Sequence, residues 1–323
     1  MRRREFLGAG VVAAALAACS SVETGTPTAE PATPAVLPGQ ARHVLEQVDA
    51  ALARAVPANN PRLLGTRLTG PASREWNARL TVAANRKQKL TAPSPLQVRR
   101  LILPAVNPWP RWFMAAGTSS GEPTPVLRVF RSVTARNPYG LWSELSLLPG
   151  ASLPDLASPL SGTPVLAPGD GKGLVAAPSA VVASYARALT AGSTATSQFA
   201  PDQFRQQVAG QTAADRRKLG VAGIASVSNQ HRPSADGLVA LRTQDGGALV
   251  VAALEQLYDV KVRAGSGVVS LDPDLAALAG ASSVGRSLRR TSVETVAFRV
   301  PPAGGGVVTV IAAAKADVSA VGS

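Results

Sequence analysis

The sequence predicts an α+β fold built from two tandem domains, each with helices packed on a curved antiparallel sheet. Two observations predict it. Each half of the chain reads as two helical segments followed by a run of strands, and residues 149–173 form a connector rich in Pro, Gly, Ser and Asp. We therefore expect domains at 41–168 and 174–323. Because no residue-level repeat is visible, the duplication is inferred from element order alone.

In the first half, apolar residues at helical spacing predict a helix over residues 41–56, which Pro57 ends. Residues 61–70 are expected to form a loop. Pro71 suits the first position of a second helix, which carries Trp76 and Leu80 on one side. From Leu96 the apolar period shortens to that of strands. The expected strands are 98–103, 112–116, 126–133 and 141–147.

The second half repeats this order. A helix is expected from Pro178 to Leu189, with Gly192 as its stop, and a second helix over residues 202–219. The triplet Asp245-Gly246-Gly247 lies between two apolar runs and predicts a hairpin turn. The expected strands are 224–230, 237–244, 248–262, 292–300 and 307–313.

The N-terminal residues are typical of an export signal. Arg2, Arg3 and Arg4 precede an apolar run over residues 6–18 that is too short to span a bilayer, which needs about 20 residues. The sequence Leu16-Ala17-Ala18-Cys19 resembles the bacterial lipobox, in which the cysteine receives a diacylglyceryl group and then becomes the first residue of the mature chain. The expected parts are a signal peptide at 1–18 and a flexible tether at 19–40.

The resemblance to a lipobox implies palmitate-type acylation and a location on the outer face of the cytoplasmic membrane. Arg3-Arg4-Glu5-Phe6-Leu7 also resembles the twin-arginine pattern, with Phe6 and Leu7 at the expected offset from the arginine pair. A general secretory signal with a basic start is the alternative. Cys19 is the only cysteine, so once it is acylated the chain has no disulfide, thiolate metal site or cysteine nucleophile.

The formal net charge is +13 at pH 7, and loss of three arginines and one glutamate with the signal lowers it to +11. A basic domain tethered to a membrane is expected to associate with anionic lipids or acidic wall polymers. No motif supports nucleic-acid binding. Aromatic residues make up 4% of the chain, so the core is expected to consist of Ala, Val and Leu.

No motif predicts catalysis, a cofactor or a metal. Gly169-Asp170-Gly171-Lys172-Gly173 lacks the first glycine and the final Ser or Thr of a phosphate-binding loop. His43 and His231 lack metal-ligand spacing, and His231 is expected in a polar turn. Asp272-Pro273-Asp274 indicates a helix start with Asp as its cap, and paired acid–base chemistry there is the alternative.

Two basic clusters, Arg216-Arg217-Lys218 and Arg286 with Arg289 and Arg290, are expected to be solvated surface. The functional alternative is contact with phosphate or carboxylate groups. The large aromatic residues of the first half are expected to fill the core, and lining an apolar cleft is the alternative. They are Trp109, Trp112, Trp142 and Tyr139.

Several segments resemble uncharacterised actinobacterial lipoproteins over most of the mature chain, a family to which no activity is assigned. The segments are residues 137–142, 147–154, 171–175, 199–202 and 241–250. The element order in each half is also similar to the cone-shaped fold of nuclear transport factor two and its relatives, where a curved sheet and helices enclose a pocket. This second likeness concerns the fold alone and implies no function.

These observations favour a non-enzymatic envelope lipoprotein that binds an amphipathic ligand or a partner protein near the membrane. The alternative is a hydrolase or isomerase that uses a pocket carboxylate or histidine, for which Glu255 or Asp259 pointing inward from a long strand would be the candidates. A third interpretation is a structural subunit of an export or wall-synthesis assembly, which an exposed apolar patch would favour.

Overall fold

The computed structural model describes residues 34–105, 108–193, 196–221 and 223–323, and Ala32–Ser323 form one compact unit. The predicted signal, the lipobox with Cys19, and the twin-arginine residues Arg3, Arg4, Phe6 and Leu7 lie outside the described residues, as does most of the predicted tether.

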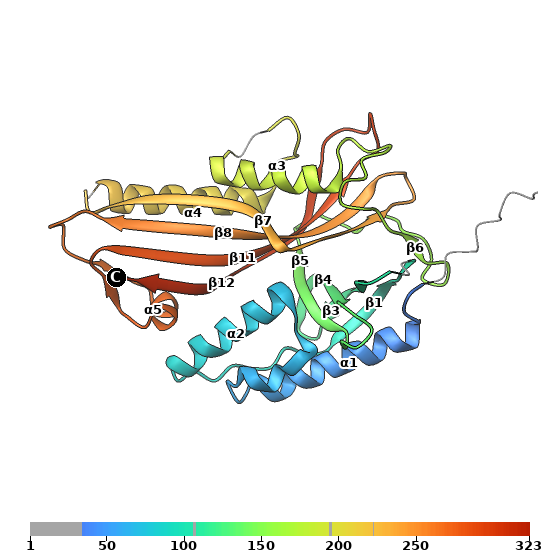
Figure 1. Cartoon of the computed structure of the whole chain (residues 1–323), viewed down its shortest axis with the longest axis horizontal. Coiled ribbons are helices and arrows are strands. Elements are labelled where there is room, and N and C mark those ends of the chain that lie inside the picture. Colours follow the sequence, from blue (N-terminus) through green and yellow to red (C-terminus); the bar gives the residue numbers. More distant parts are fainter. Residues whose placement is uncertain (1–33, 106–107, 194–195, 222) are drawn as a thin grey trace, which may run out of the picture. The chain divides into compact units, whose positions relative to one another are not determined.

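The first half contains the expected two helices and run of strands (Figure 1). The expected loop after the first helix holds a 3-10 helix, η1, because Pro61 opens it and the Asn60 side chain accepts a hydrogen bond from the Arg62 amide at 3.0 Å. The elements are α1 (Pro38–Ala55), η1 (Pro61–Arg67), α2 (Gly70–Asn85), β1 (Leu96–Ile102), β2 (Pro104–Ala105), β3 (Arg111–Ser119), β4 (Glu122–Ser132), β5 (Gly140–Leu147) and β6 (Thr163–Pro164).

The second half repeats the order with longer strands. The expected strands 224–230 and 237–244 are one strand with an irregular register between Pro233 and Leu238, which lets the ladder continue past a proline. The last strand extends nine residues beyond the expected Ala313. The elements are α3 (Pro178–Ala191), α4 (Gln203–Val221), β7 (Ala225–Arg242), β8 (Ala248–Val262), β9 (Val269–Ser270), α5 (Pro273–Ala279), β10 (Ser283–Val284), β11 (Ser287–Val300) and β12 (Thr309–Gly322).

The main sheet has eight strands in the order β1-β3-β4-β5-β12-β11-β8-β7, and every pairing in it is antiparallel. Each half contributes four strands, and the halves meet through their last strands. The junction is short, with Leu147 opposite Ala312 and Ser146 opposite Ala313. The α+β class is therefore confirmed, but two tandem domains are not shown, because one sheet joins the halves within one compact unit.

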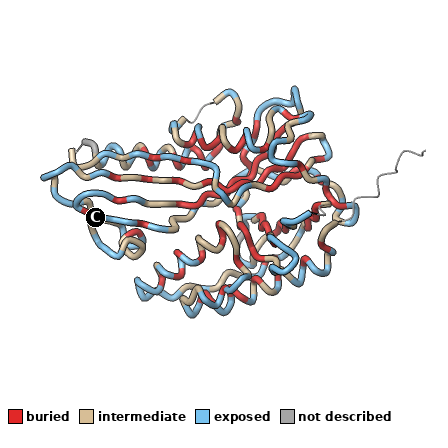
Figure 2. The backbone as a smooth tube through the Cα atoms, viewed as in Figure 1, coloured by how far each residue is buried: buried red, intermediate tan, exposed pale blue. Residues whose placement is uncertain are grey.

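Three apolar clusters hold the helices on the sheet and the two halves of the sheet together. The first-half strands pack against α1 and α2 through Phe113, Phe130 and Leu141, and the second-half strands pack against α3 and α4 through residues such as Val250 and Phe298. The third cluster lies between the two halves of the sheet and takes residues from both. Its members include Met114, Leu127, Trp142, Leu249, Val251, Ala297 and Ile311. Figure 2 shows buried backbone concentrated where the halves overlap.

Beyond this overlap, four strands continue together as an extension that we call the arm, made of residues 225–232, 255–262, 287–295 and 314–322. In Figure 1, α4 runs along the β7 and β8 side of the arm and α5 lies beside β12. Tyr258, Val260 and Leu288 are buried there in a smaller apolar cluster. Helices α2 and α5 both contact β12, and with this strand of the arm they form the cleft described next.

Candidate functional site

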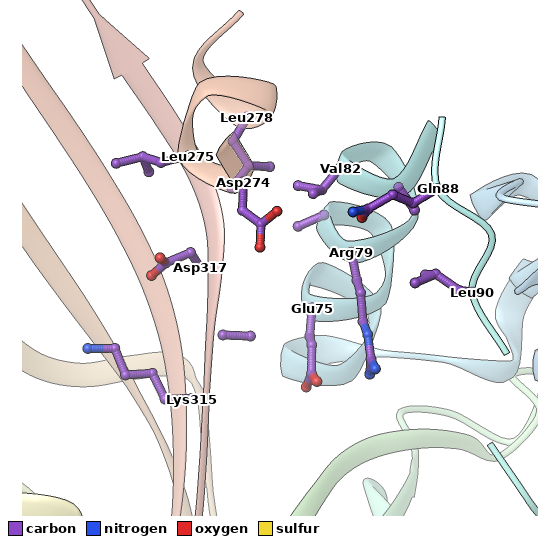
Figure 3. Close-up of a pocket in the computed structure, with 13 residues that line it drawn as sticks. Glu75, Arg79, Val82, Gln88, Leu90, Asp274, Leu275, Leu278, Lys315 and Asp317 are labelled. Atoms are coloured by element: carbon purple, nitrogen blue, oxygen red, sulfur yellow. The ribbon is translucent and has the colours of Figure 1, made fainter. Parts of the chain in front are cut away.

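A cleft of about 450 Å³ lies between α2, α5 and β12 (Figure 3). Helix α2 buries Ala72, Trp76 and Leu80 against the first-half core, which leaves its opposite side facing the arm. In Figure 3, Glu75 and Arg79 extend from α2, and Asp274 extends from α5 into the space between the helices. The cleft also has apolar lining from Ala78, Val82, Leu90, Leu275 and Leu278.

Polar contacts hold helix α5 against α2, and caps at both ends stabilise the helix itself. Asn85 on α2 donates a hydrogen bond to the Ala277 carbonyl at 2.9 Å, and Arg86 forms an ion pair with Asp274. The Asp272 side chain accepts a hydrogen bond from the Leu275 amide at 2.9 Å, as the sequence predicts for an N-cap. Gly280 ends α5 in the left-handed conformation, with φ of 70°. These contacts fix one wall of the cleft.

Glu75 is the unusual group of this cleft. Burial raises the pKa of its carboxyl, and the negative charge of Glu144 raises it further, whereas Arg79 lowers it, so that the pKa is about 7 instead of 4.5. Within the described part of the chain, Glu75 has no hydrogen-bond or ion-pair partner. Arg79 stacks over the Trp76 ring at 4.7 Å, which keeps its guanidinium near the cleft.

The neighbour that raises the pKa of Glu75 belongs to a buried ion cluster beneath α1 and α2. Arg128 on β4 is almost completely buried, donates to Asp49 at 2.7 Å and forms an ion pair with Glu144 on the adjacent strand β5. Burial alone would lower the pKa of Arg128, but the two carboxylates outweigh it and raise the pKa. Because Arg128 is paired with Asp49 and Glu144, Arg79 is the cation that partly offsets the raised pKa of Glu75.

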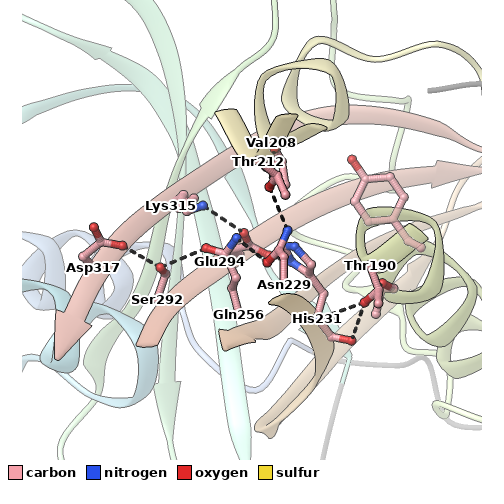
Figure 4. Close-up of polar contacts among 12 residues, drawn as sticks. Thr190, Val208, Thr212, Asn229, His231, Gln256, Ser292, Glu294, Lys315 and Asp317 are labelled. Carbon is pink, nitrogen blue, oxygen red and sulfur yellow. Dashed lines mark hydrogen bonds and ion pairs between the residues drawn. The ribbon is translucent and has the colours of Figure 1, made fainter. Parts of the chain in front are cut away.

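A second polar group lies on the opposite side of the arm, beneath α3 and α4 (Figure 4). His231 Nδ1 lies 2.8 Å from Glu294 Oε2, both side chains are fully buried, and Lys315 Nζ lies 3.7 Å from Glu294 Oε1. Burial is the main cause that lowers the pKa of Lys315. A separate run of hydrogen bonds joins Gln256 through Asn229 to Thr212 on α4.

This buried network corrects the expectation that His231 lies in a polar turn. The residue is inside β7, because the ladder with β8 runs through residues 225–233 without a break. Its main-chain amide donates a hydrogen bond to the Thr190 hydroxyl on α3 at 2.8 Å. These contacts tie α3 and α4 to the sheet through Thr190 and Thr212, while His231 Nε2 and Glu294 Oε1 have no hydrogen-bond partner among the described residues. Since His231 and Glu294 are closed off from solvent, the network does not form a binding surface.

The two carboxylates that the sequence suggested as inward-pointing pocket groups both form ion pairs with arginine. Glu255 lines two clefts but binds Arg232 at 2.5 Å and lies 3.8 Å from Arg74. Asp259 binds Arg289 at 2.7 Å. Neither is a free inward carboxyl group. Glu75 could not be singled out from the sequence, because its position next to Trp76 on a helix gives no separate signal.

Other predicted residues are distributed through the fold. Trp112 and Trp142 are core residues as expected and Tyr139 is half-buried against Phe113, but Trp109 is exposed and stacks with Arg111 at 4.9 Å.

His43 is exposed on α1. The loop at residues 169–173 lies before α3, where the Lys172 amide donates to Asp170 at 3.0 Å. Of the basic clusters, Arg290 covers the Tyr258 ring at 4.3 Å, whereas Arg286 is solvent-exposed.

Two features are absent from the described part of the chain. No helix in residues 34–105, 108–193, 196–221 or 223–323 is long and apolar enough to cross a membrane. The same residues contain no group of three or more His, Cys, Asp or Glu side chains that could hold a metal ion.

Comparison with known proteins gives a family and a distant relative. The family described as a domain of unknown function (DUF8094) matches residues 32–322. An uncharacterised lipoprotein of Streptomyces avermitilis is 27% identical over 260 residues, which cover 76% of this chain and 73% of that protein. No solved structure matches the chain. The likeness to nuclear transport factor two therefore stays a prediction from element order.

Proposed function

The chain belongs to the DUF8094 family, and from the lipoprotein relative and the cleft geometry we propose that it is a lipid-anchored envelope protein that binds a small amphipathic molecule between α2 and α5. The observation that carries the proposal is the cleft itself, in which one half-buried carboxyl with a pKa of about 7 lies beside a cation and an aliphatic wall. We propose a binding role and no catalysis, at the outer face of the cytoplasmic membrane.

The lining fits a ligand with one polar end. At neutral pH a large share of Glu75 is protonated, so its carboxyl can donate a hydrogen bond, while Arg79 offers a positive charge to an acceptor group. Val82, Leu90 and Leu278 provide the apolar surface for the remainder of the molecule. A volume of about 450 Å³ suits a small molecule more than a folded partner.

An enzyme is the alternative, and one observation favours it. A carboxyl group with a pKa near 7 is matched to general acid–base work at neutral pH. The two proposals differ in what Glu75 does. In a binding protein, Glu75→Gln keeps the hydrogen-bond donor and retains most of the affinity. In a hydrolase or isomerase, the same change abolishes turnover of the bound molecule while leaving it bound.

The binding proposal is tested by filling the cleft. Val82 lines it and Ala84 is exposed two residues further along the same helix, so Val82→Trp and Ala84→Trp form a matched pair. We expect the parent lipoprotein, extracted from membranes and examined by native mass spectrometry, to carry a small molecule that the Ala84→Trp protein retains and the Val82→Trp protein loses. Equal occupancy in the two variants would place the molecule elsewhere, and a parent protein without any bound molecule would contradict a binding role.

A further inference from the structure

We propose that the end of the arm is a membrane-contact surface that binds the headgroups of anionic lipids. This arm tip comprises the last turn of α4 with Arg216, Arg217 and Lys218, and the strand ends with Lys261, Arg263, Val268, Arg286, Arg289 and Val321. The inference rests on the proposed lipid anchor, but it does not depend on a ligand in the cleft between α2 and α5.

The backbone brings these residues together from four separate segments. Ala225 of β7 is opposite Val262 of β8, Ser287 of β11 is opposite Lys261, and Leu288 is opposite Gly322 of β12, so all four strands end at one place. The α4 terminus joins them, because the Ile224 amide donates to the Leu219 carbonyl at 3.1 Å. The arrangement is visible in Figure 1, where the ends of α4, β7 and β8 lie together.

The positive charges at the tip are mostly free. Within the described residues, none of the side chains of Arg216, Arg217, Lys218, Lys261, Arg263 and Arg286 has a hydrogen-bond or ion-pair partner. The neighbouring acids are already engaged: Asp215 accepts a hydrogen bond from Tyr258, Asp259 binds Arg289, and Asp272 caps α5. Unpaired cations concentrated in this way form an attractive surface for a polyanion.

Two exposed valines favour a lipid surface over a polar polymer. Val268 is 60% exposed and Val321 is 68% exposed. Both lie among the cations, because Val321 is opposite Arg289 in the sheet and Val268 packs beside Gly285, the residue before Arg286. A membrane interface can bury aliphatic side chains while its headgroups neutralise the cations. A polysaccharide or polyphosphate would use the cations and leave the valines in water.

The predicted tether leaves the domain room to reorient over the bilayer. The 18 residues between Cys19 and Pro38 can span at most about 60 Å. An acylated Cys19 would hold the tip at a high effective concentration over the membrane, so even weak headgroup binding would orient the domain.

The experiment uses residues 19–323 with Cys19→Ser, which retain the whole compact unit and remove the acyl anchor, in sedimentation with vesicles. The vesicles contain phosphatidylcholine with or without 30% phosphatidylglycerol, in about 0.1 M salt. Each cation near an anionic surface contributes about fivefold to binding. We expect the triple variant Lys261→Gln, Arg263→Gln and Arg286→Gln to lose at least tenfold in binding to the anionic vesicles.

The matched control removes the same charge elsewhere. Arg54, Arg62 and Arg136 are exposed, and within the described residues their guanidinium groups have no partner. Changing these three to Gln should reduce binding less than threefold, and Val268→Ser with Val321→Ser should weaken it without any change of charge. Equal losses in the two charge variants would overturn the proposal, because binding would follow net charge alone. Loss of binding to an isolated anionic wall polymer, with vesicle binding unchanged, would identify a polymer partner instead and would overturn it too.

Discussion

At the scale of single residues, Glu75 is the group through which the protein should respond to pH. The ordinary pKa of its carboxyl is 4.5 and the folded protein raises it to about 7, so the folded state holds this proton more tightly than the unfolded state. The contribution of Glu75 to the free energy of unfolding is therefore highest below pH 4.5, falls as the pH rises to about 7, and levels off above that. We expect Glu75→Gln to remove this decrease.

The magnitude follows from the same shift. Glu75→Gln should be more stable than the parent at pH 8 by on the order of 1–3 kcal/mol, with little difference near pH 4.5. Chemical denaturation at the two pH values measures it. Glu46→Gln is the control, because the Glu46 side chain on α1 is 76% exposed. A parent and a Glu75→Gln protein with the same pH dependence would show that Glu75 ionises normally in the fold.

The sequence could not reveal this residue, and the reason is physical. The charge that raises the pKa of Glu75 belongs to Glu144 on β5, and the arginine that serves Glu144 belongs to β4. His231 and Glu294 likewise meet across 63 positions of the chain. Local patterns record helix faces and turns, whereas these pairs arise only when the strands take their places in the sheet. Asp272 could be predicted because a cap acts within one turn.

At the scale of elements, the predictable parts were those with strong local signals. The Asp245-Gly246-Gly247 turn and the strand 248–262 are confirmed, because an apolar run on both faces and a tight turn identify a central hairpin. The second half of β12 was missed because its sequence Ala314-Lys315-Ala316-Asp317 buries little and lies beyond the pairing with β5. Such a strand is defined by its neighbours β11 and α5 instead of its own hydrophobicity.

Helix α5 gives the second prediction, because seven residues are too few for a stable isolated helix. Its N-cap and its contacts with α2 must hold it. Asp272→Ala should destabilise α5 by about 1 kcal/mol, which corresponds to roughly fivefold faster amide hydrogen exchange within residues 275–280. Asp274→Ala removes the ion pair with Arg86 but leaves the cap, so it should have a smaller effect. Unchanged exchange in the Asp272→Ala protein would show that packing of Leu275 alone fixes the helix.

At the scale of the whole molecule, the two halves are similar in element order yet share one sheet and one central core. Two tandem domains at 41–168 and 174–323 could unfold separately, whereas a single unit unfolds in one step. Within the main sheet the junction between the halves is two residue pairs long, and a few main-chain hydrogen bonds at Leu148, Asp155 and Leu166 add to it. The cluster that contains Met114, Trp142, Val251 and Ile311 is therefore the principal connection between them.

This arrangement predicts cooperative unfolding, and the tryptophans allow a direct test. Trp76, Trp109, Trp112 and Trp142 all belong to the first half, so tryptophan fluorescence reports that half and the shared core, whereas far-ultraviolet circular dichroism reports both halves. Since unfolding either half would expose the apolar surface of the other, we expect the two signals to give the same denaturant midpoint. Val251→Ala in β8 removes part of the shared core from the second half and should shift the fluorescence midpoint equally. Two separate midpoints, with fluorescence unaffected by Val251→Ala, would instead establish two tandem domains joined by a passive strand contact.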